Sequence, residues 1–138
     1  MIRSFQKIDA RRLKGNQFSG TTGFDFVFSN PAFYKSTLVS KDDEVHAIIC
    51  FTRYWGNCFA AFFLISEGLT LREAVELKRF IYQAVVDFQA DRVQTDSVAC
   101  EKLTKWHKFL GFKSEGIRVK MAHDQDYEMW ALLKGRDF

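Results

Sequence analysis

The chain has 138 residues, 47% of them hydrophobic, which is enough apolar material for the core of one domain over residues 1–138. Fifteen Phe and three Trp indicate a core rich in aromatic side chains. The formal net charge of +3 favours an anionic small ligand and argues against nucleic acid as a partner.

The sequence contains no run of 18 apolar residues, no secretory signal and no lipidation motif. We therefore expect a cytoplasmic protein without a membrane partner. Cys50, Cys58 and Cys100 have no paired spacing, and we interpret them as reduced thiols. No metal site is predicted.

The first part of the chain predicts a strand, a short helix and a loop. Residues 1–5 are typical of a strand, and residues 8–13 of a helix with basic residues on its wet side. Residues 15–23 are rich in Gly, Ser, Thr and Asn, which predicts a loop. Residues 24–28 fit either a strand or a bulky helical turn, and Asn30-Pro31 marks a turn.

A three-strand meander is predicted next, over residues 33–40, 45–54 and 58–65. Tight polar turns join these strands and imply antiparallel neighbours. The last strand, CFAAFFLI, is an unbroken apolar run of the kind found in strands buried on both faces. We therefore expect it at the centre of the sheet.

The residues after this strand predict a long amphipathic helix. Thr70 and Glu73 have the spacing of a capping box, in which each side chain satisfies a backbone N–H group of the first turn. Six apolar residues fall on one helical face: Ala74, Leu77, Ile81, Ala84, Val85 and Phe88. The free N–H groups at the start of this helix make it a candidate anion site.

The remaining chain predicts a strand, a helix and two further strands. Residues 92–98 follow a helix crossover, so we expect a strand parallel to residues 58–65. Residues 99–110 predict a helix that ends at Gly111. Alternating apolar residues from Ile117 to Met121 and the stretch 127–134 predict the last strands, with a turn over 123–126. This order predicts an α/β (α+β) fold with a mixed sheet covered by helices.

The run Leu103 to Phe112, LTKWHKFLGF, resembles the helix ending in Gly-Phe of the GNAT superfamily of acetyl-CoA-dependent N-acetyltransferases. The element order is similar to that fold over nearly the whole chain, including the closing strand around residues 126–132. The layout also resembles small GNAT-like proteins of podophages, including internal virion proteins. The resemblance implies a GNAT-like, mainly antiparallel sheet of about six to seven strands, with acetyl-CoA as cosubstrate.

The resemblance also implies a V-shaped cleft between the strands 58–65 and 92–98. The pantetheine of acetyl-CoA is expected to pair with the splayed first strand, and its pyrophosphate to sit on the start of the long helix. The amine acceptor is expected to be a small molecule or a protein.

The turn after residue 64 corresponds to the family motif Gln/Arg-x-x-Gly-x-Gly/Ala. Gly68 keeps this motif, whereas Ile65 and Thr70 depart from it. Together with Leu69 and Arg72, these three residues are the expected cofactor-binding set.

Glu67 lies in the same turn and would place a carboxylate beside two phosphate charges. At ~5 Å, with an effective dielectric near ~20, each repulsion is on the order of 3 kcal/mol before screening. Arg72 is expected to offset part of it. Glu67 is alternatively a catalytic base or a solvated carboxylate.

Two residues are candidate catalytic groups. His107 lies where the family commonly has a Tyr that protonates the departing thiolate, and an imidazole titrates near neutral pH. The alternative is a partly exposed helix histidine beside Trp106. Asp96 is expected near the cleft, where it would accept a proton from the amine, or else it is a polar residue at a sheet edge.

Three weaker candidates have structural alternatives. His46 lies at the start of a strand, and we interpret it as a strand-end residue. The stripe of Lys102, Lys105 and Lys108 fits the 3′-phosphate of CoA or a solvated helix face. Cys100 lies near a helix start, which lowers a thiol pKa.

Two functions follow from these observations. The leading one is acetyl transfer from acetyl-CoA to an amine. The alternative is a catalytically degenerate GNAT-fold phage or prophage protein that serves as an interaction or virion component, with a phage or host protein as partner.

Overall fold

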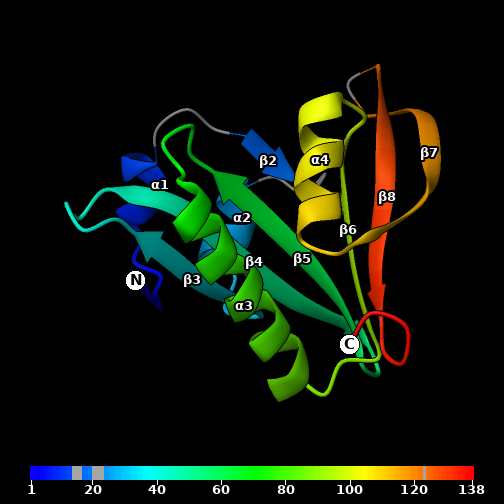
Figure 1. Cartoon of the computed structure of the whole chain (residues 1–138), viewed down its shortest axis with the longest axis horizontal. Coiled ribbons are helices and arrows are strands. Elements are labelled where there is room, and N and C mark those ends of the chain that lie inside the picture. Colours follow the sequence, from blue (N-terminus) through cyan, green and yellow to red (C-terminus); the bar gives the residue numbers. More distant parts are fainter. Residues whose placement is uncertain (14–16, 20–23, 123) are drawn as a thin grey trace.

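Seven strands of the described chain form a sheet in the order β1-β3-β4-β5-β6-β8-β7, and β2 pairs with β5 outside this path (Figure 1). The structure is a computed structural model that describes residues 1–13, 17–19, 24–122 and 124–138. The strands are β1 Ile2–Ser4, β2 Gln17–Ser19, β3 Phe33–Val39, β4 Val45–Trp55, β5 Cys58–Ile65, β6 Arg92–Val98, β7 Lys113–Ala122 and β8 Gln125–Leu133. The β5–β6 pair is parallel and the others are antiparallel, which confirms the predicted mixed, mainly antiparallel sheet.

Helices cover both faces of this sheet. They are α1 Asp9–Arg12, α2 Phe24–Ser29, α3 Leu71–Asp87 and α4 Glu101–Phe109. The apolar residues of α3 pack on one face together with Leu110, which follows α4. Leu13, after α1, and Val27 of α2 pack on the other face. No helix in the described part of the chain is long and apolar enough to cross a membrane.

Strand β5 has the central position that its apolar sequence predicts. It pairs with β4 on one side and β6 on the other, and all its residues except Ile65 are buried. A strand with covered faces on both sides needs apolar residues at every position, which explains the absence of alternation. The tight β4–β5 turn uses Gly56 with φ of +49°, a conformation that favours glycine.

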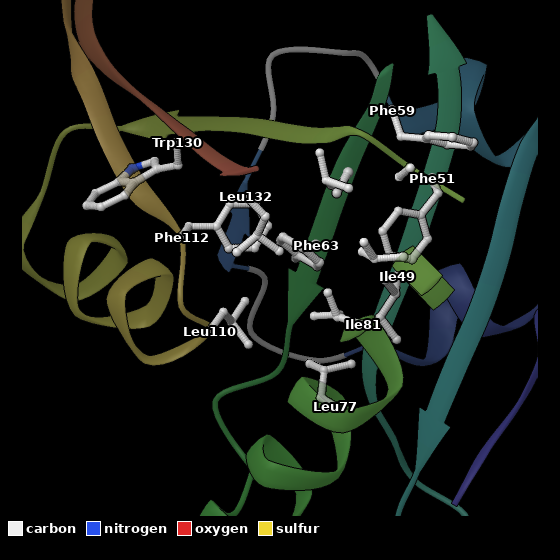
Figure 2. Close-up of a cluster of buried hydrophobic side chains, with 14 of the residues drawn as sticks. Ile49, Phe51, Phe59, Phe63, Leu77, Ile81, Leu110, Phe112, Trp130 and Leu132 are labelled. Atoms are coloured by element: carbon white, nitrogen blue, oxygen red, sulfur yellow. The ribbon is translucent and has the colours of Figure 1, made fainter. Parts of the chain in front are cut away.

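The larger core cluster lies between the sheet and α3, and it is built mainly from aromatic and branched side chains. Figure 2 shows Phe63 at its centre, between the α3 residues Leu77 and Ile81 and the C-terminal residues Phe112 and Trp130. Burying each such side chain contributes roughly 1.5–3 kcal/mol. This cluster fixes α3 and α4 relative to β5.

Two segments differ from the sequence prediction. Residues 17–19, predicted as part of a loop, form β2, because backbone pairing with β5 orders a segment too short to show a strand pattern. The closing strand begins at Gln125, within the predicted turn. The ambiguous segment from Phe24 is the helix α2. The rest of the predicted loop, at 15–16 and 20–23, and residue 123 lie outside the described residues.

Candidate functional site

Strands β5 and β6 separate after a short parallel stretch. Their paired register runs from Cys58 beside Arg92 to Ala60 beside Gln94. Beyond that point β5 stays beside β4 as far as Ile65, while β6 stays beside β8. A V-shaped gap between strands therefore opens towards their carboxyl ends, where open α/β sheets bind ligands.

The turn between β5 and α3 satisfies several of its own backbone donors. The N–H groups of Gly68 and Leu69 donate to the Ser66 hydroxyl (3.1 Å) and the Ser66 carbonyl (3.2 Å). The N–H of Thr70 donates to Glu73 Oε1 (3.1 Å), and Glu73 N–H donates to Thr70 Oγ1 (3.2 Å), which confirms the capping box. Four N–H groups of the segment expected to hold a pyrophosphate, those of Gly68, Leu69, Thr70 and Glu73, are thus already engaged.

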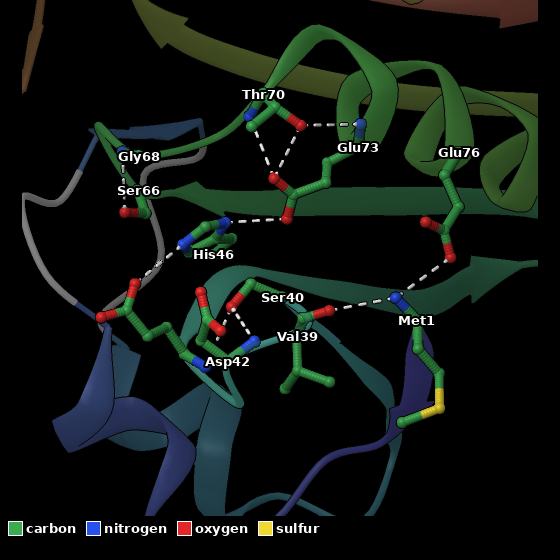
Figure 3. A network of polar contacts seen from close by, with 11 residues as sticks. Met1, Val39, Ser40, Asp42, His46, Ser66, Gly68, Thr70, Glu73 and Glu76 are labelled. Carbon is green, nitrogen blue, oxygen red and sulfur yellow. Dashed lines mark hydrogen bonds and ion pairs between the residues drawn. The ribbon is translucent and has the colours of Figure 1, made fainter.

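His46 joins this capping box to β4, as Figure 3 shows. Its Nδ1 donates to Glu73 Oε2 at 2.7 Å, and its Nε2 lies 3.4 Å from Glu44 Oε2. Burial alone would raise the pKa of Glu73, but hydrogen bonds from Thr70 and His46 outweigh it and lower that pKa. His46 is therefore more than a strand-end residue, because it holds the first turn of α3 on the sheet.

A cavity of about 390 Å³ lies beside this histidine. Its lining residues are Arg12, Glu44, Val45, His46, Ser66, Glu67 and Gly68. A Cβ added to Gly68 would lie 3.4 Å from His46 Nε2, so the imidazole packs closely against the turn. Glu67 and Gly68 therefore line a hollow shared with His46.

A second hollow, of about 280 Å³, lies between the end of β5 and α4. We call it the α4 slot; it is lined by Ile65, Lys102, Leu103, Lys105 and Trp106. The Trp106 indole N–H is buried and has no hydrogen-bond partner among the described residues. The slot thus combines an apolar wall with two lysine side chains, while the indole N–H is buried below its surface.

Strand β2 lies in the V between β5 and β6. It runs antiparallel to β5, with Gln17 opposite Ile65, Phe18 opposite Leu64 and Ser19 opposite Phe63. It also lies against β6. Figure 1 shows β2 beside the end of β5, near α4. The edge that β5 turns towards the gap is therefore paired by the chain itself.

His107 is fully buried within the core. Its ring stacks on Trp130 with centroids 5.3 Å apart, and Nδ1 donates to the Leu103 carbonyl at 2.7 Å. Burial lowers the pKa of His107 to about 4, against smaller raising effects of Leu103 and Glu128. This environment differs from the partly exposed position weighed as the alternative, and it keeps the imidazole neutral at pH 7. The proton-donor role stays a prediction.

Asp96 is half-buried on the opposite face of the sheet from His107. Along β6 the residues alternate, with Val93 buried in the α3 core and Asp96 on the other face, together with Arg92. Burial and the negative charge of Asp96 raise the pKa of Tyr54. The structure does not bring the two candidate catalytic residues together, and the role of Asp96 as a base stays a prediction.

No protein-family model and no curated protein matches the sequence. Solved structures do match. One assigned as a phosphinothricin N-acetyltransferase gives a TM-score of 0.73 at 12% identity, covering 96% of this chain and 97% of that one. The spermidine/spermine N-acetyltransferase SpeG of Vibrio cholerae gives 0.71 at 12% identity, covering 96% and 91%. Aminoglycoside 6′-acetyltransferase type Ii gives 0.61 at 14% identity, covering 79% and 73%.

The chain has the GNAT fold. At these identities the likeness concerns the fold alone, and it agrees with the element order that the sequence predicted. The expected cofactor-binding residues divide around the β5–α3 turn. Ile65 lines the α4 slot, whereas Gly68 lines the His46 cavity. Thr70 caps α3, and Leu69 and Arg72 lie beside it.

Within this GNAT fold, the sequence offered little sign of two features at the cleft. His46 reaches Glu73 across 27 residues of chain, and only the capping role of Glu73 has a local pattern. β2 has only three residues, too few to distinguish an alternating strand pattern from a loop. Its polar-apolar-polar order was the one local indication of a strand.

The cysteines are free, and they differ in environment. Cys50 and Cys58 are buried, and burial raises the pKa of Cys50 to about 12. Cys100 is exposed at the N-cap of α4 and makes no side-chain capping bond. Among the described residues, no group of three His, Cys, Asp or Glu side chains is placed to hold a metal ion.

Proposed function

We propose that this protein is an N-acetyltransferase that moves an acetyl group from acetyl-CoA to an amine. The observation that carries the proposal is the V between β5 and β6 in a GNAT fold, with the α4 slot at its side. The solved structures that share the fold carry the names of acetyltransferases, among them a spermidine/spermine N-acetyltransferase and an aminoglycoside 6′-acetyltransferase. A small amine, or the amine of a protein, is the acceptor that this comparison supports.

The α4 slot supplies groups that suit the acyl donor. Lys102 and Lys105 line the slot and carry positive charge that matches the phosphates of CoA, although Lys105 is also paired with Glu101 at 3.0 Å. Since the N–H groups of Gly68, Leu69 and Thr70 are engaged, the lysines carry most of the phosphate recognition.

The proposed reaction depends on orienting the amine and the thioester, and it forms no covalent intermediate with the protein. The amine nitrogen attacks the thioester carbon, a C–N bond forms, the C–S bond breaks, and CoA leaves as a thiolate. The amine loses one proton and the thiolate gains one. Holding both reactants in the V would supply up to roughly 7–11 kcal/mol through proximity. Asp96 and His107 are the groups proposed for the two proton transfers. For His107 this requires that its Nδ1–H leave the Leu103 carbonyl for the thiolate, because the neutral ring carries one proton.

The test measures acetyl-CoA binding by calorimetry and thiol release with spermidine, an aminoglycoside and a peptide amine. Lys102→Ala and Lys105→Ala should each weaken binding by about five-fold, the equivalent of ~1 kcal/mol for an exposed ion pair. Lys108→Ala is the matched control, because Lys108 is an exposed lysine of α4 outside the slot. Unchanged affinity in the Lys102 and Lys105 variants would show that acetyl-CoA binds outside the α4 slot. If the natural protein binds no acetyl-CoA, the proposed function is wrong.

A second candidate is a GNAT fold without donor binding that serves as an interaction or virion component, with a phage or host protein partner. One observation favours it: the turn that should hold the pyrophosphate directs its N–H groups at Ser66 and Glu73. Neither heat of acetyl-CoA binding nor thiol release would be expected of such a protein.

A further inference from the structure

Strand β2 uses the backbone groups that the acyl donor would need. The residues Phe63 to Ile65 of β5 pair with Ser19 to Gln17 on the side that faces the V. The other edge of the same residues is paired with β4, from Ala47 to Ile49. A strand has two edges, and each edge accepts one partner at a time. The end of β5 therefore has no backbone edge left for a ligand while β2 is in place.

The pantetheine of an acyl donor is an extended amide chain that would bind a strand edge as another strand does. The resemblance to the GNAT fold puts that edge on β5, inside the V. β2 lies in the same gap, between β5 and β6. The two therefore compete for one set of hydrogen-bonding groups.

We propose that β2 is a built-in competitor for the donor site: acetyl-CoA pairs with β5 only after Gln17–Ser19 has left the edge of that strand. The inference rests on the proposed function, since it concerns how the same site is filled. It goes beyond that function by assigning a regulatory role to a segment outside the expected binding set. Anything that draws β2 away, such as an acceptor or a partner protein, would activate the enzyme.

The expected size of the effect follows from the population of the open form. The apparent affinity for the acyl donor equals the intrinsic affinity multiplied by the fraction of molecules in which β2 has left β5. β2 pairs through only three residues, so release is within reach of thermal motion. We expect the closed state to reduce donor affinity by about 10- to 100-fold.

The first experiment locks β2 in place. Gln17 and Ile65 lie directly opposite each other, and Cα atoms of such antiparallel pairs are about 4.5–5.5 Å apart, within the range of a disulfide. Gln17→Cys with Ile65→Cys, in a Cys100→Ser background, should form the bond on oxidation. CoA binding should be lost in the oxidised protein and should return on reduction. Gln17→Cys alone, in the same background, is the matched control.

The second experiment releases β2. Ser19→Pro removes a backbone N–H that faces β5, because the N–H of Ser66 donates to β4 and alternation along β5 turns Phe63 and Ile65 towards β2. This variant should bind CoA at least ten-fold more tightly than the natural protein and should lose hydrogen-exchange protection at the N–H groups of Phe63 and Ile65. Ser19→Ala keeps the N–H and is the control for the lost hydroxyl. If Ser19→Pro does not fold, the locked protein decides alone.

The outcomes separate the two proposals. Equal CoA affinity in the oxidised and reduced forms of the locked protein overturns the role of β2 and leaves the proposed function standing. Failure of the disulfide to form overturns the β2–β5 pairing. An absence of CoA binding in every variant, with β2 released, overturns both proposals.

Discussion

His107 shows how burial changes the chemistry of a single side chain. Stacked on Trp130 and surrounded by the core, its imidazole has no access to water. Burial lowers the pKa to about 4, whereas an exposed histidine titrates near ~6.5. At pH values between these two pKa values, the His107 imidazole is protonated in the unfolded chain but neutral in the folded protein. Protonation of His107 therefore favours unfolding in this pH range.

The stability of the protein should therefore fall as pH decreases from about 6.5 to about 4. Across this pH window His107 should lower the free energy of unfolding by on the order of 3 kcal/mol. Below the pKa of the folded protein it should cause no further loss of stability. The variant His107→Phe keeps an aromatic ring and should lack this part of the slope. Urea unfolding at several pH values measures it. Asp9 and Glu73, whose pKa values are lowered, contribute to the slope in both proteins, so only the difference counts.

The same variant tests the proton-donor role predicted for His107. A lost general acid lowers kcat by ~10²–10⁴-fold with little change in KM. A variant with full turnover and a flattened pH–stability profile would assign His107 to the core. Equal pH slopes in the two proteins would contradict the low pKa.

At the scale of elements, the end of α4 depends on one glycine. Gly111 adopts φ of +92°, and its N–H donates to the Lys108 carbonyl at 3.0 Å. A Cβ at this position would lie 2.2 Å from the Tyr82 hydroxyl oxygen, in α3. The Gly-Phe end of the helix is therefore needed both for the turn and for the close contact of α4 with α3, which brings Phe112 into the core.

Gly111→Ala should destabilise the protein by roughly 2–4 kcal/mol, the sum of left-handed backbone strain and overpacking against Tyr82. Adding Tyr82→Phe removes the clashing oxygen and should recover part of that loss. Gly135→Ala is the control for backbone strain alone, because Gly135 has φ of +83° and nothing within 4 Å of an added Cβ. Thermal or urea unfolding of the four proteins gives the comparison, and equal losses at Gly111 and Gly135 would rule out the Tyr82 contact.

At the scale of the whole molecule, the β5–α3 turn separates two hollows of different charge. Lys102 and Lys105 are among the residues that line the α4 slot. The His46 cavity has the carboxylates of Glu44 and Glu67 in its lining, together with Arg12. An anion in the slot would feel Glu67 across the turn, through solvent, so the repulsion is smaller than direct contact would give.

Glu67→Gln should therefore tighten CoA binding by up to about three-fold at low salt, and Arg72→Ala should weaken it by a similar factor. Both effects should disappear at high salt, because mobile ions screen charges more than a Debye length apart. Calorimetry of the three proteins at two salt concentrations is the measurement. Unchanged affinity in Glu67→Gln at low salt would show that this carboxylate points away from the phosphates.

Much of the fold was predictable because its signals are local. The apolar run of β5, the capping box at Thr70 and the amphipathic face of α3 each lie within a few residues, and each was confirmed. Helix and strand periods and N-terminal caps act over one or two turns of chain, so a single sequence carries them in full. From these elements the antiparallel meander and the parallel crossover to β6 followed.

The features that decide the site depend on tertiary structure instead. β2 is a strand only because β5 offers it an edge more than 40 positions later, and His46 gains its role only where β4 meets α3. The burial of His107 likewise depends on Trp130, from the far end of the chain. Contacts of this kind have no repeating pattern in the sequence, since they depend on which surfaces packing brings together. Local sequence thus specified the sheet and helices that frame the V, and packing decided that β2 lies in it.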